Sequence, residues 1–115
     1  DSGPDHVTAG WLPDGYQLVE AENNAFQIRN IYKDQNGNSV FVNVFRKSSG
    51  VVGVDTEQAD VETANVNGYF AMIIQKNNIS QVAWANETLG YQVIIESENL
   101  PSDSLMKIAE NLSIS

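Results

Sequence analysis

The sequence predicts an α+β fold: a curved antiparallel sheet of about six or seven strands, arranged as a meander of hairpins and packed by one C-terminal α-helix. Two observations lead to this prediction. Between Tyr16 and Ser97, short segments rich in aromatic and β-branched residues alternate with turn signals. After residue 100 the apolar period changes to that of a helix. The apolar stripe of this last segment consists of Leu105, Ile108, Ala109 and Leu112.

The first expected strand follows the turn signal Leu12-Pro13-Asp14-Gly15-Tyr16. The proline sets φ for the second position of a β-turn, and the aspartate and the glycine suit the third and fourth positions. The strand is therefore expected over residues 16–20. The polar run at 21–24 is expected to end it.

Residues 26–33 and 39–47 form the next expected hairpin, because the segment 34–38, with the sequence DQNGN, is a strong turn signal between them. Closure through a three-residue loop sorts the side chains onto two faces. One face takes Phe26, Ile28, Tyr32, Val40, Val42 and Val44. The other face takes Arg29, Ile31, Lys33, Phe41, Asn43 and Phe45.

The second of these faces is the candidate interaction surface. Its polarity is mixed, so either another segment of the chain covers it or it exposes three apolar residues to a partner. We favour cover, because folded monomers seldom expose large contiguous apolar patches. If the face is open, the interaction surface comprises Ile31, Phe41, Phe45, Arg29 and Lys33. The basic residues of this hairpin are expected to neutralise neighbouring acids in preference to binding an acidic ligand group.

Two further hairpins are expected after a loop at 48–59. Asn67-Gly68 joins strands at 61–66 and 69–75, since a type I′ turn needs positive φ at both central positions. The second of these strands is apolar on both faces, as expected of a central strand covered on two sides. Residues 79–85 and 91–97 form the last pair. Its shared face takes Val82, Trp84, Tyr91, Val93 and Ile95.

The closing helix is expected to begin at Pro101-Ser102-Asp103. Ser102 suits the N-cap, and Asp103 places a negative charge at the positive end of the helix dipole. A helix of about eleven residues is too short to be stable alone, so its apolar stripe must dock on the sheet.

Size and charge limit the possible functions. The chain has 115 residues, six basic and fifteen acidic side chains, and a net charge of −9. This charge repels phosphate backbones, so nucleic acid is not an expected partner. The chain has no Cys, which excludes disulfides, thiolate nucleophiles and thiolate metal sites. No run approaches the roughly 20 apolar residues of a membrane span, so any membrane link is expected to run through an anchor missing from this chain.

The chain is interpreted as one α+β domain at 11–115, preceded by a linker or tail at 1–10. The start, Asp1-Ser2-Gly3-Pro4-Asp5, lacks the charged and apolar blocks of a signal peptide. Its polar residues, Gly and Pro are typical of a linker. We therefore expect a longer precursor whose N-terminal part, such as an anchor, precedes this segment.

No residue pattern indicates catalysis, a cofactor or a metal site. The one His, His6, lies in the polar tail, where nothing would hold a general base in place. The acid pairs Glu96/Glu98 and Asp60/Glu62 are favoured as solvated strand residues over a catalytic pair. Segment 34–38 fails the spacing of a calcium loop, and a hard-cation site gathered by acids at 55–60 is a minor alternative. We expect the chain not to be an enzyme.

The order of these features resembles a bacterial family of unknown function, DUF4367. The start at Leu12-Pro13-Asp14-Gly15-Tyr16 is similar to the family's LPxGY motif. The hairpin at 32–45, the Asn67-Gly68 turn, Trp84 before an aromatic-aliphatic strand, and the ending with Ile108-Ala109-Glu110 also have counterparts. The likeness extends from Trp11 almost to the end of the chain. These motifs are turn and core residues, so they are specific for the fold and silent about chemistry.

The resemblance implies an extracytoplasmic domain, because such proteins, largely from Gram-positive Firmicutes, typically lie outside the membrane behind a transmembrane helix or lipoprotein signal. Some follow anti-sigma-factor-like segments. The leading hypothesis is a non-enzymatic sensing or interaction domain of a membrane- or lipid-anchored bacterial protein, at the cell surface, with a protein or small ligand as partner and possible regulatory use. The alternative is a carrier-like module that binds a small apolar ligand between sheet and helix. Neither the partner nor the oligomeric state follows from the sequence.

Overall fold

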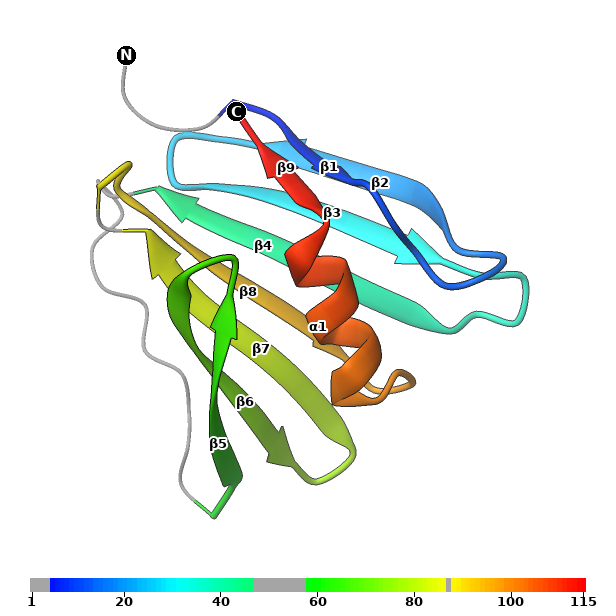
Figure 1. Ribbon diagram of the computed structural model, residues 1–115. Coiled ribbons are helices and arrows are strands. Elements are labelled where there is room, and N and C mark those ends of the chain that lie inside the picture. Colours follow the sequence, from blue (N-terminus) through cyan, green and yellow to red (C-terminus); the bar gives the residue numbers. More distant parts are fainter. Residues whose placement is uncertain (1–4, 47–57, 87) are drawn as a thin grey trace.

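A seven-stranded antiparallel sheet with one helix on its face forms the frame of the molecule (Figure 1). The computed structural model describes residues 5–46, 58–86 and 88–115. The sheet consists of β2 (Gln17–Asn23), β3 (Gln27–Lys33), β4 (Ser39–Arg46), β5 (Asp60–Val66), β6 (Tyr69–Lys76), β7 (Ile79–Asn86) and β8 (Tyr91–Ser97). The helix is α1 (Ser102–Glu110). The predicted α+β fold, an antiparallel sheet packed by one C-terminal helix, is confirmed.

The meander is interrupted once, in the middle of the sheet. The strand order is β2-β3-β4-β8-β7-β6-β5, so β4 pairs with the last strand of the sheet and not with the next one in the chain. The chain therefore makes two meanders, β2 to β4 and β5 to β8, which join edge to edge. The connection between them begins at residue 47, and most of the loop expected at 48–59 lies outside the described residues.

The two strongest turn signals form the turns that they predict. Val66 pairs with Tyr69, and φ is +53° at Asn67 and +96° at Gly68, as a type I′ turn requires. In the β3–β4 hairpin, the Asp34 N–H donates to the Asn38 carbonyl at 3.0 Å, which closes the predicted three-residue loop. These turns fix the register, and the two side-chain faces of the β3–β4 hairpin follow as predicted.

At the start of the sheet, the turn lies one residue later than predicted, and the first long strand ends several residues later than predicted. The Tyr16 N–H donates to the Pro13 carbonyl at 3.2 Å, so the turn begins at Pro13 and Gly15, at φ +86°, takes its third position. Strand β2 then runs through most of the polar segment that was expected to end it. An edge strand is held by backbone bonds to one neighbour, so exposed polar side chains do not break it. Phe26, expected beside Ile28, precedes β3 and is 62% exposed.

A second, two-stranded sheet brings the two ends of the described chain together. Strand β1 (Val7–Ala9) pairs with β9 (Leu112–Ile114). Neither strand is predicted from the sequence, because three residues are too few to show a period. β1 lies within the segment interpreted as a linker, and β9 removes Leu112 from the predicted helix. Apolar side chains of both strands pack on the core, and the Asn30 side chain donates to the Val7 carbonyl at 3.0 Å.

The N-cap of the helix lies one residue earlier than expected. Pro101 is the N-cap, Ser102 is the first helical residue, and no side chain caps the helix start. The N–H groups of Ser104 and Leu105 donate to the Pro101 carbonyl at 3.0 and 3.3 Å. Proline at this boundary has a preset φ and no N–H to satisfy, which explains why it displaces the serine. The helix is nine residues long.

The core lies between α1 and the sheet. The helix buries Leu105, Ile108 and Ala109, of which the first two expose no surface. They pack on rows of valine, isoleucine and aromatic side chains from β3, β4, β6, β7 and β8. The buried members from these strands are Ile28, Tyr32, Val40, Val42, Val44, Ala71, Val82, Trp84, Val93 and Ile95. In Figure 1 the helix and the β1–β9 pair lie on the same side of the sheet.

We expect Gly10→Ala to destabilise the protein, because β1 is part of the folded structure. The Gly10 N–H donates to the Asn111 carbonyl at 2.8 Å, and a Cβ at position 10 would lie 2.8 Å from the same oxygen. The β1–β9 pair would have to move apart, at a cost on the order of 1–3 kcal/mol. Urea denaturation measures the change, with Thr8→Ala, an exposed position of β1, as the control. Equal stability of the two variants would contradict the prediction.

The stability of the β3–β4 hairpin is expected to fall in acid through Asp34. Desolvation raises the pKa of Asp34, but hydrogen bonds from the Asn38 side chain and from the N–H groups of Asn38 and Asn36 outweigh it, so the pKa lies below its usual value of 3.8. The carboxylate therefore stabilises the folded state fully above about pH 4 and loses this effect as pH falls through the folded pKa. Urea unfolding at several pH values should show wild type more stable than Asp34→Asn at pH 7, with the gap closing in acid. A pH-independent gap would be the contrary result.

Candidate functional site

The sheet has one face that no described helix or strand covers, called here the open face. It lies opposite α1, β1 and β9, which share the other side in Figure 1. Ile31, Phe41 and Phe45 are on this face and are each partly exposed, and Lys33 is exposed. The cover that the sequence analysis favoured for this face is therefore not supplied by the described elements.

Three of the five predicted surface residues form one cluster. Ile31 and Phe41 are direct cross-strand partners, and the Arg29 guanidinium lies over the Phe41 ring, 5.0 Å from its centroid. Phe45 is four residues further along β4, opposite Gln27, and Lys33 is at the end of β3. The open-face cluster, defined as Arg29, Ile31 and Phe41, is thus built by the register of one hairpin.

Arg29 has an unsatisfied donor within this cluster. Its Nε is buried and has no hydrogen-bond partner in the described structure. The cross-strand neighbour of Arg29 on β2 is Glu22, which is exposed. A buried donor without an acceptor costs about 1–3 kcal/mol, more than the roughly 0.5–1 kcal/mol that an exposed cation–π contact returns. The contact with Phe41 alone therefore does not explain why an arginine at this position would favour stability.

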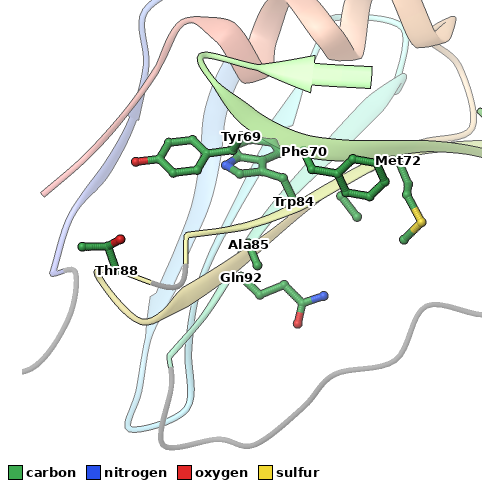
Figure 2. A pocket seen from close by; sticks show the side chains of 8 residues that line it. Tyr69, Phe70, Met72, Trp84, Ala85, Thr88 and Gln92 are labelled. Atoms are coloured by element: carbon green, nitrogen blue, oxygen red, sulfur yellow. The ribbon is translucent and has the colours of Figure 1, made fainter. Parts of the chain in front are cut away.

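The open face continues across the sheet into a cavity of about 510 Å³ between β6 and β7. Gln92 on β8 joins the two regions, because it pairs with Phe45 on one side and with Ala85 on the other. We call this cavity the β6–β7 cleft. Its lining residues are Tyr69, Phe70, Met72, Ala83, Trp84, Ala85, Thr88 and Gln92, seven of which are labelled in Figure 2.

The cleft exists because two neighbouring strands separate. The β6–β7 ladder ends at the pair Ala71 and Trp84, although the two strands continue to Tyr69 and Asn86. The tip of the β5–β6 hairpin is drawn towards the helix, where the Asn67 side chain donates to the Glu110 carbonyl at 3.1 Å (Figure 1). The end of β6 follows this tip and leaves β7, so aromatic side chains that would otherwise meet a neighbouring strand line a gap.

A buried asparagine holds the rim of the cleft. Asn86 is 2% exposed, and its Nδ2 donates to the Tyr69 hydroxyl at 2.9 Å and to the Tyr91 hydroxyl at 3.3 Å. Its Oδ1 accepts the Leu89 N–H at 3.0 Å. These bonds fix the Tyr69 ring. Phe70, next in the chain, is 65% exposed, the largest value among the exposed large apolar side chains of the described residues.

A second hollow, of about 360 Å³, lies at the opposite end of β6 and β7 and is polar. Its lining includes the side chains of Gln58, Asp60, Gln75, Lys76 and Asn77. Its described lining has no aromatic side chain, and Asn77 and Asn78 belong to the turn between β6 and β7. We assign it no role.

The other candidate residues are not gathered into a site. Asp60, Glu62 and Glu98 are exposed, and Glu96 is partly buried and accepts a hydrogen bond from Gln81 at 3.0 Å. His6 is exposed. Residues 55 and 57 of the weak cation alternative lie outside the described residues. Within the described ranges, no three metal-ligating side chains of the His, Cys, Asp or Glu type lie together.

Sequence reasoning missed the cleft, although one of its signals was present. The strand at 69–75 is apolar on both faces, a pattern that predicts a central strand covered on two sides. In the structure β6 is next to the edge, and Phe70 and Met72 face the open side. Trp84, expected in the core, is 7% exposed and lines the cleft as well. The missing information was that the β6–β7 ladder stops early, which depends on the contact with α1.

The comparisons identify a family and no individual relative. The family model described as a domain of unknown function (DUF4367) matches residues 6–112. Searches of curated proteins and of solved structures found no match. In the described part of the chain, no helix has the length and apolar character needed to cross a membrane. Because the match covers nearly the whole sequence, this chain belongs to the DUF4367 family.

Proposed function

We propose that this domain is a non-enzymatic interaction domain that binds a protein partner through the open face of its sheet. The observation that carries the proposal is the row of partly exposed apolar side chains, Ile31, Phe41 and Phe45, on a face that no described helix or strand covers. Aromatic residues and arginine are enriched at the centres of protein interfaces, and this row contains both together with Arg29.

The unsatisfied Arg29 donor supports the same proposal. A guanidinium stacked on an aromatic ring presents a flat, partly desolvated surface of the kind that anchors interfaces. Binding a partner over this cluster would bury more of Phe41 and Ile31 and strengthen the cation–π contact by excluding water. The arginine is therefore better explained by binding than by folding.

The location and attachment of the domain are also part of the proposal. We infer an extracytoplasmic domain of a bacterial protein held at the membrane by a helix or a lipid, with a possible regulatory use of the kind seen next to anti-sigma-factor-like segments. The support is membership of the DUF4367 family, together with an acidic, Cys-free sequence. Protease treatment of intact cells that produce the full-length protein, with fractionation, tests it. A full-length protein that is protected in intact cells and recovered in the soluble fraction would contradict it.

The carrier alternative stays a prediction. It places an apolar ligand between sheet and helix, where Leu105 and Ile108 have no exposed surface. The cleft described above lies elsewhere, between β6 and β7. We therefore do not develop a carrier role for the space under the helix.

Arg29→Met is expected to leave stability unchanged or to raise it by up to about 1–2 kcal/mol. The change removes a cation–π contact worth roughly 0.5–1 kcal/mol and also removes a buried unsatisfied donor that costs about 1–3 kcal/mol. Urea denaturation measures the free energy of unfolding, with Arg29→Lys as the control that keeps the charge. A loss of more than about 1 kcal/mol in the Met variant would mean that Arg29 serves the fold.

A photo-crosslinking amino acid at Ile31, in the full-length protein in its own cells, is expected to label a defined partner protein. The same probe at Thr8, which is exposed on the other side of the sheet, is the matched control. Labelling from Ile31 should disappear with Phe41→Asp, which buries a charge in the interface. Circular dichroism checks that this variant folds. No specific adduct from Ile31, or equal labelling from both positions, would reject the proposed surface.

A further inference from the structure

We propose that the β6–β7 cleft receives an aromatic side chain of the partner, presented by a segment that is otherwise basic. This inference rests on the proposed function, because it names the anchor with which the partner binds. It concerns a different set of residues from the open-face cluster.

The shape and lining of the cleft suit one flat apolar group. Ala83 and Ala85 on β7 line the cleft together with Tyr69, Phe70 and Trp84. In Figure 2 the Trp84 ring lies beside Tyr69 and Phe70, and the small Ala85 side chain points towards Gln92. Met72 contributes a polarisable sulfur, which makes favourable contacts with aromatic rings. The volume of about 510 Å³ lies within the range that holds an aromatic group. Aromatic side chains in such pockets are typical interface anchors.

The openness of the cleft favours a side chain of a larger partner over a free small molecule. Phe70 is 65% exposed, and Ala85 and Thr88 at the rim are exposed as well. Sites for small ligands bury about 70–90% of the ligand surface, which a hollow with so open a side cannot do alone. A partner that presents the aromatic group would itself cover the open side. Gln92 connects the cleft to Phe45, so one partner can span both regions of the open face.

The negative charge of the chain favours a partner whose aromatic side chain is flanked by basic residues. The described lining residues of the cleft are uncharged, so the entering group is neutral. The chain as a whole carries −9, which attracts cationic partners and repels acidic ones. A second copy of this chain, with the same charge, is disfavoured as occupant for the same reason. Glu96 lies outside the cleft, opposite Phe41 and four residues along β8 from Gln92, and supplies a carboxylate acceptor for a basic side chain of a partner that spans both regions.

Fluorescein-labelled hexapeptides test the inference on the isolated domain by fluorescence anisotropy. Four peptides combine a central Trp or Gly with flanking Lys or Glu residues. The Lys-flanked Trp peptide is expected to bind at least about tenfold more tightly than each of the other three, which corresponds to about 1.4 kcal/mol or more. Its affinity is expected to fall as salt is raised, because screening weakens the charge attraction. Lack of binding up to about 1 mM, or equal binding of the Trp and Gly peptides, would overturn the proposal.

Two variants that replace an alanine with leucine, one in the cleft and one elsewhere, locate the site. Ala85→Leu enlarges a side chain that lines the cleft and is expected to weaken binding of the Lys-flanked Trp peptide at least tenfold. Ala21→Leu, at an exposed position of edge strand β2, is the matched control and should leave binding unchanged. Phe70→Ala is a third variant, which removes an exposed aromatic ring from the lining of the cleft and is expected to weaken binding as well. It keeps the test valid if Ala85→Leu does not fold. Binding that survives both cleft variants would place the site elsewhere and overturn the proposal.

Further experiments distinguish a partner's aromatic side chain from other occupants of the cleft, and distinguish this proposal from the proposed function. If free indole binds the cleft as tightly as the Trp peptide, the site is one for a small ligand and the inference fails. If sedimentation shows a dimer that Ala85→Leu abolishes, the occupant is a second copy of this chain, and the inference fails as well. The Ile31 crosslink in cells distinguishes the two proposals. A crosslink lost with Phe41→Asp but unchanged with Ala85→Leu would leave the proposed function standing and reject the role of the cleft.

Discussion

The packing of α1 on the sheet is the interaction on which the other features of this domain depend. A nine-residue helix does not persist alone in water, and the apolar face of the sheet must be buried against another element. Leu105 and Ile108 bury their whole surface against the valine rows, which is worth about 1.5–3 kcal/mol for each side chain. Helix and sheet therefore stabilise each other. The β1–β9 pair extends this cover along the same side.

The same constraint produces the two surface features described above, the open-face cluster and the β6–β7 cleft. Since α1, β1 and β9 all lie on one side of the sheet, the cluster of Arg29, Ile31 and Phe41 is left on a face without a described covering element. The bond from Asn67 to the Glu110 carbonyl holds the β5–β6 tip near the end of the helix, and β6 leaves β7 above the pair of Ala71 and Trp84. An aromatic cleft follows from a structural contact on the opposite side of the sheet. Its rim is kept rigid by Asn86.

Much of the architecture was predictable because its signals are local. The Asn67-Gly68 turn demands positive φ at two positions, and this requirement alone sets the pairing of β5 with β6. The loop after Lys33 sets the register of β3 with β4 in the same way, and with it the neighbours of Phe41. The features that were missed depend on distant parts of the chain. The length of β2 and the existence of a strand at Val7–Ala9 are decided by what each segment meets in space.

Local sequence signals predict the fold class, the register of the hairpins, the apolar stripe of the helix and which side chains share each face. The reason is that turn geometry and hydrophobic period are properties of neighbouring residues. The pairing of β4 with β8, the small sheet formed by β1 and β9, and the separation of β6 from β7 follow only from the packed structure. These depend on contacts between residues far apart in the chain, since the burial of one face against α1 selects among several possible strand orders. The place of Trp84, shared between the core and the cleft, follows from that selection.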